Sequence, residues 1–136
     1  MVPFWIINYG SIAIGFLLAL WLKKVSWKFL ISFLIFSRIP DIISTSLGLH
    51  QVNHDYTAER CTASYYMLVQ INLPNIIVLI LHSILLISII LVIYKLIWKK
   101  SEFSKFIIRL IIFSIAIAGF LVSLSNFWLI FSKNLF

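Results

Sequence analysis

The chain contains few charged residues: Asp, Glu, Lys and Arg together make up 11% of its 136 residues. A soluble domain carries about 25% charged residues, so a fold with a water-covered surface is excluded. Hydrophobic residues make up 62% of the chain, and this surplus has to face lipid or other apolar partners. The composition therefore indicates an integral membrane protein, with the lipid bilayer as its first partner.

The sequence also lacks the marks of several functional classes. A single cysteine, Cys61, rules out an internal disulfide. The P-loop, GxSxG, HExxH and paired CxxC motifs are all absent. We therefore expect no cofactor, no metal centre and no catalytic residues, and the sequence favours a protein without catalytic activity of its own.

The basic residues, which give a net charge of +7, are grouped rather than scattered. The groups are Lys23, Lys24 and Lys28, and then Lys95, Lys99, Lys100, Lys105 and Arg109. Each group lies between two apolar runs, as cytoplasmic loops do under the positive-inside rule. This placement favours contact with anionic lipid headgroups and argues against a nucleic-acid partner.

Four apolar segments are long enough to cross a bilayer, so we predict an all-α fold, an integral membrane four-helix bundle forming one transmembrane domain over residues 1–136. The predicted spans cover about residues 4–22, 27–49, 74–98 and 106–131. A half-apolar, aromatic stretch predicts a short interfacial helix before the third span, and Pro74 predicts a break there.

The positive-inside rule also predicts the orientation of the four spans. It places the lysine-rich loops in the cytoplasm, and both termini and the 50–62 loop outside. Lys133 is the one exception to this pattern. The frequent Ile, Lys, Ser and Phe suit an archaeal or organellar source.

Small residues recur every four positions in two of the predicted spans. Ser11, Gly15 and Ala19 do so in the first span, and Gly119 and Ser123 in the last. Such stripes let helix backbones approach closely in lipid. They predict a helix–helix contact, within the bundle or with a partner, and chance recurrence is the other interpretation.

The second predicted span contains two charged residues, Arg38 and Asp41. A charge inside a span costs roughly 2.5–3.5 kcal/mol on insertion scales, and it usually faces the bundle interior with a partner. The i, i+3 spacing lets Arg38 and Asp41 pair within their own helix, and Thr45 lies one turn further on. Pro40 removes a backbone donor there and frees a carbonyl that Arg38 can use.

Other polar residues fall at a similar depth in the remaining spans. The helical rise places Asp41 and His82 about 12–13 Å below the outer surface, and Asn8 and Asn126 at roughly 8–10 Å. We therefore predict a polar cluster of Arg38, Asp41, Thr45, His82 and Glu59. It is either a satisfied set of contacts that fixes helix register or a site for protons, a small solute or catalysis. A tilted helix from which Arg38 reaches the membrane surface is the third interpretation.

The polar segment after the second span contains the best metal-ligand candidates. His50 and His54 are spaced i, i+4, and Asp55, Glu59 and Cys61 follow. This donor set suits zinc or copper. The spacing matches no known signature, however, and a solvated polar loop is the favoured interpretation.

One family shares part of this pattern. The run Asp41-x3-Thr45-x3-Leu49, followed by Glu59 and by His82 in the next span, resembles a domain-of-unknown-function family of small prokaryotic multi-pass proteins (DUF5658-like). Its members carry D-x3-T at the end of a span and E-x-N-P before the next, whereas Glu59 here is followed by Arg-Cys-Thr. The resemblance implies that Asp41, Thr45 and Glu59 act together, and it implies no reaction.

Two functional hypotheses follow from these features. The first is a structural or accessory subunit of a larger membrane protein complex, with other membrane subunits as partners. The alternative is a small stand-alone transporter or membrane enzyme that uses Arg38, Asp41, His82 and Glu59. A viral or envelope membrane protein is a third class that fits the composition.

Overall fold

The computed structural model describes residues 4–51, 67–71 and 73–134. The main helices are α1 (Phe4–Trp21), α2 (Trp27–Gln51), α4 (Asn75–Ile97) and α5 (Glu102–Asn134). A further helical turn over residues 67–70 precedes α4, where the short interfacial helix is predicted. No strand occurs in these ranges, so the predicted all-α class is confirmed.

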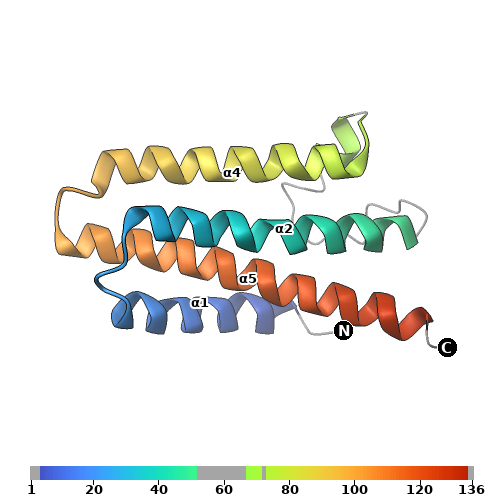
Figure 1. The fold of residues 1–136 in the computed structure, drawn as a ribbon, viewed down its shortest axis with the longest axis horizontal. Coiled ribbons are helices and arrows are strands. Elements are labelled where there is room, and N and C mark those ends of the chain that lie inside the picture. The colour runs from blue at the N-terminus through green and yellow to red at the C-terminus, as the bar shows by residue number, and fades with distance from the viewer. Residues whose placement is uncertain (1–3, 52–66, 72, 135–136) are drawn as a thin grey trace.

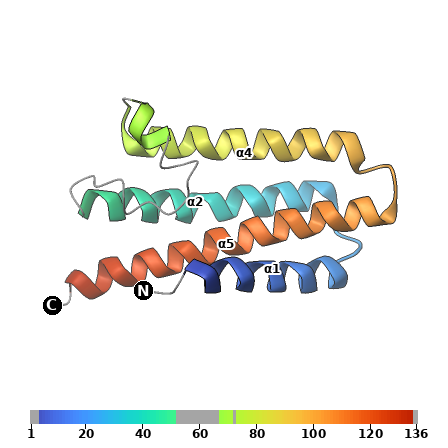
Figure 2. The same cartoon turned by 180° about the vertical axis from the view of Figure 1, so that it is seen from behind.

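The helices run in alternating directions and lie nearly side by side (Figure 1). Across the molecule the order is α4, α2, α5 and α1, and the view from behind shows the same order (Figure 2). Helix α5 packs on α1 at one side and on α2 at the other, and α4 packs mainly on α2. The longest helix is therefore the central element.

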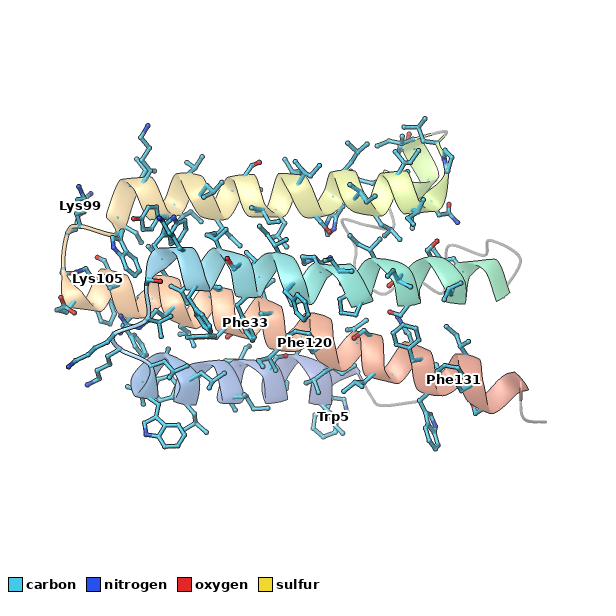
Figure 3. The ribbon with its side chains drawn as sticks, viewed as in Figure 1. Trp5, Phe33, Lys99, Lys105, Phe120 and Phe131 are labelled. Carbon is cyan, nitrogen blue, oxygen red and sulfur yellow. The ribbon has the colours of Figure 1, made fainter. Side chains whose placement is uncertain are left out.

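Both lysine-rich connections lie at the same end of the bundle, where Lys99 and Lys105 are labelled in Figure 3. We call this the lysine end, and it comprises residues 22–28 and 94–105. The end of α2, the start of α4 and the end of α5 lie at the opposite, far end (Figure 1).

Three helices are long and apolar enough to cross a membrane: Trp27–Leu49, Asn75–Ile97 and Glu102–Ser132. Helix α1 is apolar but shorter, with 18 residues, and its length of about 27 Å is at the lower limit for a span. Exposed apolar side chains cover the outer faces of all four helices, as lipid-facing surfaces do. The chain is thus a membrane protein.

The helix ends differ from the predicted spans because backbone capping, not hydropathy, sets them. Helix α5 begins before residue 106 because the Ser101 hydroxyl accepts a hydrogen bond from the backbone N–H of Ser104 at 3.1 Å. Helix α4 begins after Pro74, which has no N–H to lose, and the Pro74 carbonyl accepts from Ile77 at 3.0 Å. The predicted break near Pro74 is therefore present.

Apolar side chains form two separate buried clusters. The larger cluster, toward the lysine end, contains Ala19, Leu30, Leu34, Ile90, Ile108, Ile112 and Phe113. The smaller one, at the far end, contains Leu49, Leu68 and Val78. The ring of Phe33 on α2 lies 5.9 Å from that of Phe113 and 5.7 Å from that of Phe120, both on α5 (Figure 3).

The small-residue stripe of α1 lies against α5. Ser11, Gly15 and Ala19 are all buried. A Cβ atom placed on Gly15 would lie 2.8 Å from the backbone nitrogen of Ser114 and 2.4 Å from its Oγ atom. The two backbones therefore approach more closely than any larger residue allows, which is the contact that the stripe predicts.

Candidate functional site

An ion pair lies inside the second helix. The Arg38 Nη1 atom is 2.8 Å from Asp41 Oδ2, and each side chain is 14% exposed. The two residues are one turn apart on α2, which continues as a helix through Pro40. The pair predicted from the i, i+3 spacing is therefore present, and it lies within a segment long and apolar enough to cross a membrane.

The ion pair extends to α4. Arg38 Nε donates a hydrogen bond to the Oγ atom of Ser83 at 3.2 Å, and Ser83 is buried. Its neighbour His82 is close enough to interact electrostatically with the Asp41 carboxylate. The guanidinium of Arg38 thus bonds to its own helix with one edge and to α4 with the other, which fixes the register of the two helices.

On the other side, the ion pair extends to α5. The Thr45 hydroxyl donates to Asp41 Oδ1 at 3.4 Å. Asn126 Nδ2 donates to Thr45 Oγ1 and to Ser44 Oγ, both at 3.4 Å. Three helices therefore meet in one network. We call it the polar layer, and its members are Arg38, Asp41, Ser44, Thr45, Ser83 and Asn126.

Gly119 on α5 makes room for this network. A Cβ atom there would lie 3.2 Å from the carbonyl oxygen of Ser37 and 3.8 Å from Arg38 Nη1. A larger residue would push α5 away from α2 beside the guanidinium. Ser123, one turn further along α5, is also buried and donates to the carbonyl of Phe120 at 2.8 Å.

The buried polar atoms of the layer satisfy one another. Across the part of the chain that the structure describes, every buried side-chain nitrogen and oxygen has a hydrogen-bond partner. An unpaired polar group inside a membrane is costly, so this closure explains how α2 tolerates two charges. The network holds three helices together. Among the described residues, it leaves no buried polar side-chain atom without a hydrogen-bond partner and so offers no such atom to a ligand.

One expected member of the layer is elsewhere. Asn8, which the helical rise places at a similar depth, is exposed on α1, so it does not belong to the polar layer. Ile7 and Ser11 are buried on the face of α1 that packs against α5. Asn8, the next residue after Ile7, is turned about 100° around the helix by its 3.6-residue period, which places it outside that face.

Other expected site residues lie outside the described part of the chain. Glu59 of the predicted polar cluster is one of them, as are the candidate metal ligands His54, Asp55 and Cys61. His50 lies in α2, and its side chain is not described. Among the described residues, no three His, Cys, Asp or Glu side chains gather as a metal site requires.

Arg109 joins two helices, a role that its place among the basic residues of the sequence does not indicate. Its side chain is 4% exposed, and its Nε and Nη1 atoms donate to the carbonyls of Ala19 at 3.3 Å and of Lys23 at 3.5 Å. The last carbonyls of a helix have no partner within the helix, and a cation there is stabilising. Arg109 therefore ties the end of α1 to α5. The signal in the sequence is its position within an apolar run, Ile-Ile-Arg-Leu-Ile-Ile.

Comparisons with known proteins found no similarity: no protein-family model, no curated protein and no solved structure matches this chain.

Proposed function

We propose that this protein is a structural or accessory subunit of a larger membrane protein complex. The observation that supports this best is the closed polar layer, in which charged and polar groups from α2, α4 and α5 bond to one another. Buried polar groups that satisfy each other inside a membrane fix helix register. A rigid helix bundle of this kind is suited to a subunit that holds the other subunits of a complex in position.

Exposed aromatic side chains near the end of α5 support the presence of neighbours. Gly15 of α1 lies against Ser114, and Ala19 accepts a hydrogen bond from Arg109, so the first described residue of the antiparallel α1 lies near residue 125 of α5. Trp128 and Phe131, further along α5, are 72% and 61% exposed, and Figure 3 labels Phe131. We propose that a partner subunit covers this part of α5.

We also propose that the lysine end faces the cytoplasm. The two lysine-rich connections lie at one end of the bundle (Figure 1), so one orientation places both in the compartment that the positive-inside rule requires. Cysteine labelling from outside the cell tests this orientation. In a Cys61→Ser background, cysteines placed at Lys24 and Lys100 should resist a reagent that does not cross the membrane, and labelling of both in intact cells contradicts the orientation.

The test of the subunit proposal is purification from the native membrane. A tagged full-length chain is extracted in mild detergent, crosslinked at lysine before extraction in a parallel sample, and separated by size. We expect a stoichiometric membrane partner in both samples. A chain that runs as a lone monomer, with no crosslinked neighbour, contradicts the proposal.

A second candidate is a small transporter or membrane enzyme, and one observation favours it: an ion pair inside a span lies within electrostatic range of a histidine on the next helix. Asp41→Asn and His82→Ala separate the two candidates when folding and a growth or transport phenotype are measured together. A folded variant that loses the phenotype supports the site. Loss of stability without a specific phenotype leaves only the structural role.

A further inference from the structure

The lysine end concentrates the charge of the chain. Eight of its eleven basic residues lie there or one turn inside, but only one of its four acidic residues, Glu102. Six lysines at this end are exposed: Lys23, Lys24, Lys28, Lys95, Lys99 and Lys100. Lys105 is 34% exposed and its Nζ atom is 3.4 Å from Glu102, which is 87% exposed. The surface is therefore strongly cationic.

An aromatic cluster lies directly beneath these lysines. The ring of Trp27 on α2 stacks on that of Tyr94 on α4 at 3.5 Å, and Trp98 is 6.1 Å from Trp27 and 5.2 Å from Tyr94. All three side chains are partly buried. Tryptophan and tyrosine prefer the headgroup level of a bilayer, so the cluster locates that level at the lysine end.

A lysine is the next residue in the sequence after each of these rings. The pairs are Trp27-Lys28, Tyr94-Lys95 and Trp98-Lys99, and the lysines are exposed whereas the rings face inward. Lys105 of α5 lies over the Trp98 ring, 5.8 Å from its centroid. Lys105 of α5 therefore lies against the aromatic cluster, and the exposed Lys28 of α2 and Lys95 of α4 lie at the same end of the bundle.

The two helices that begin at this end supply their own caps. The Ser26 hydroxyl accepts from the backbone N–H of Phe29 at 3.2 Å, and Ser101 does the same for Ser104. Each cap occupies one backbone N–H of its helix, and the exposed ammonium groups of the lysines carry the full charges that meet an anion. The phosphate diester of a phospholipid matches this arrangement. The negative charge of the phosphate meets the ammonium groups, and the acyl chains of the lipid lie along the apolar helix faces.

We propose that the lysine end is a binding site for anionic phospholipid, with the headgroup phosphate held by lysines around the Trp27, Tyr94 and Trp98 cluster. The site is independent of the subunit proposal, because it needs no protein partner. Each lysine near an anionic surface contributes roughly a fivefold gain in affinity. Part of this gain is lost at high salt.

Native mass spectrometry of the full-length protein with phosphatidylglycerol and phosphatidylcholine tests the site. We expect the wild type to bind phosphatidylglycerol at least about tenfold more tightly, from the contributions of several lysines. The triple variant Lys99→Gln, Lys100→Gln and Lys105→Gln should lose affinity by up to about a hundredfold. The matched Lys→Arg triple variant keeps the charges and should keep the preference, as should Lys133→Gln at the other end of α5.

Three results would overturn the proposal. One is equal binding of the two lipids by the wild type. Another is unchanged binding by a Gln triple variant whose helicity by circular dichroism equals that of the wild type. The third concerns the thermal stability of the protein in phosphatidylcholine. If inorganic phosphate raises that stability as much as phosphatidylglycerol does, the lysines bind a soluble anion rather than a lipid. If the triple variant does not fold, the single variant Lys28→Gln replaces it, with an expected loss of roughly fivefold.

Discussion

Helix α5 packs against its two neighbours in different ways. Against α1 the contact is made by small residues and backbone, with Gly15 directly on Ser114. Against α2, toward the far end, the contact is a hydrogen-bonded polar network that includes Asn126 and Thr45. Near Gly15, the α1 side of α5 therefore depends on the fit of surfaces, whereas near Asn126 the α2 side depends on the pairing of polar groups.

This difference explains why the two sides tolerate different changes. In lipid, apolar surface gives no driving force between helices, so close packing and hydrogen bonds have to supply it. The α1 side fails when a side chain becomes too large. The α2 and α4 side fails when one partner of the ion pair is removed, because the other charge then stays in the membrane without its counter-ion.

The largest expected effect comes from breaking the ion pair. Asp41→Leu leaves Arg38 unpaired within α2, and we expect the free energy of unfolding to fall by about 3 kcal/mol. The double variant Arg38→Leu/Asp41→Leu removes both charges and should recover most of that loss. Reversible unfolding in mixed detergent micelles, followed by tryptophan fluorescence, measures both. Equal losses in the single and double variants contradict the pairing.

The next effect tests the fit of α1 on α5. Gly15→Ala forces the backbones apart, because the new Cβ would lie 2.8 Å from the Ser114 nitrogen, and we expect a loss of about 2 kcal/mol. Gly10→Ala is the matched control on the same helix, since nothing lies within 4 Å of its Cβ position. If Gly10→Ala destabilises the protein as much as Gly15→Ala, the contact is not as described.

A smaller effect is expected at the lysine-side end of the same interface. Arg109→Met keeps an unbranched apolar stem but removes the hydrogen bonds to the Ala19 and Lys23 carbonyls. We expect a loss of about 1.5 kcal/mol, the lower range for hydrogen bonds to a charged group. The exposed Lys24→Gln should change stability by less than about 0.5 kcal/mol. The same unfolding titration compares the two variants, and an unchanged stability of Arg109→Met would show that the guanidinium does not hold α1.

The smallest effect is expected at Asn126. Its two hydrogen bonds to α2 are long, 3.4 Å each, and interhelical hydrogen bonds in membranes average about 0.6 kcal/mol. Asn126→Ala should therefore cost at most about 1.2 kcal/mol by the same titration. Ser132→Ala removes only a bond to its own helix, from Ser132 to the Leu129 carbonyl, and serves as the control. A loss at Asn126 as large as that of Asp41→Leu would show that the α5 contact dominates the layer.

Much of the fold follows from local sequence signals. The apolar runs predict the helices, the i, i+3 spacing predicts the Arg38–Asp41 pair, and the four-residue recurrence of small residues predicts the α1 contact. Each signal depends on residues near one another in the chain, where helical geometry fixes the distance. The resemblance to the DUF5658-like family and the role of Glu59 stay predictions.

The contacts between helices were harder to predict. Depth along a span placed Asn8 level with the polar layer, but depth does not specify which face of a helix meets its neighbour, and Asn8 is exposed. Nothing in the sequence distinguishes Ser83, the partner of Arg38 on α4, because serine is common in spans. The sequence groups Arg109 with the lysines of a basic loop, whereas its side chain reaches carbonyls at the end of another helix.

The most direct test of the central claim, that the polar layer holds the helices rather than acting on a solute, uses Arg38→Leu/Asp41→Leu in the native membrane. The variant replaces the chromosomal copy, and the quantity measured is the amount of partner-bound complex together with cell growth. We predict that both stay near the wild-type level, because an apolar pair keeps the helices packed. A double variant that is folded and bound to its partner but no longer supports growth would contradict the account.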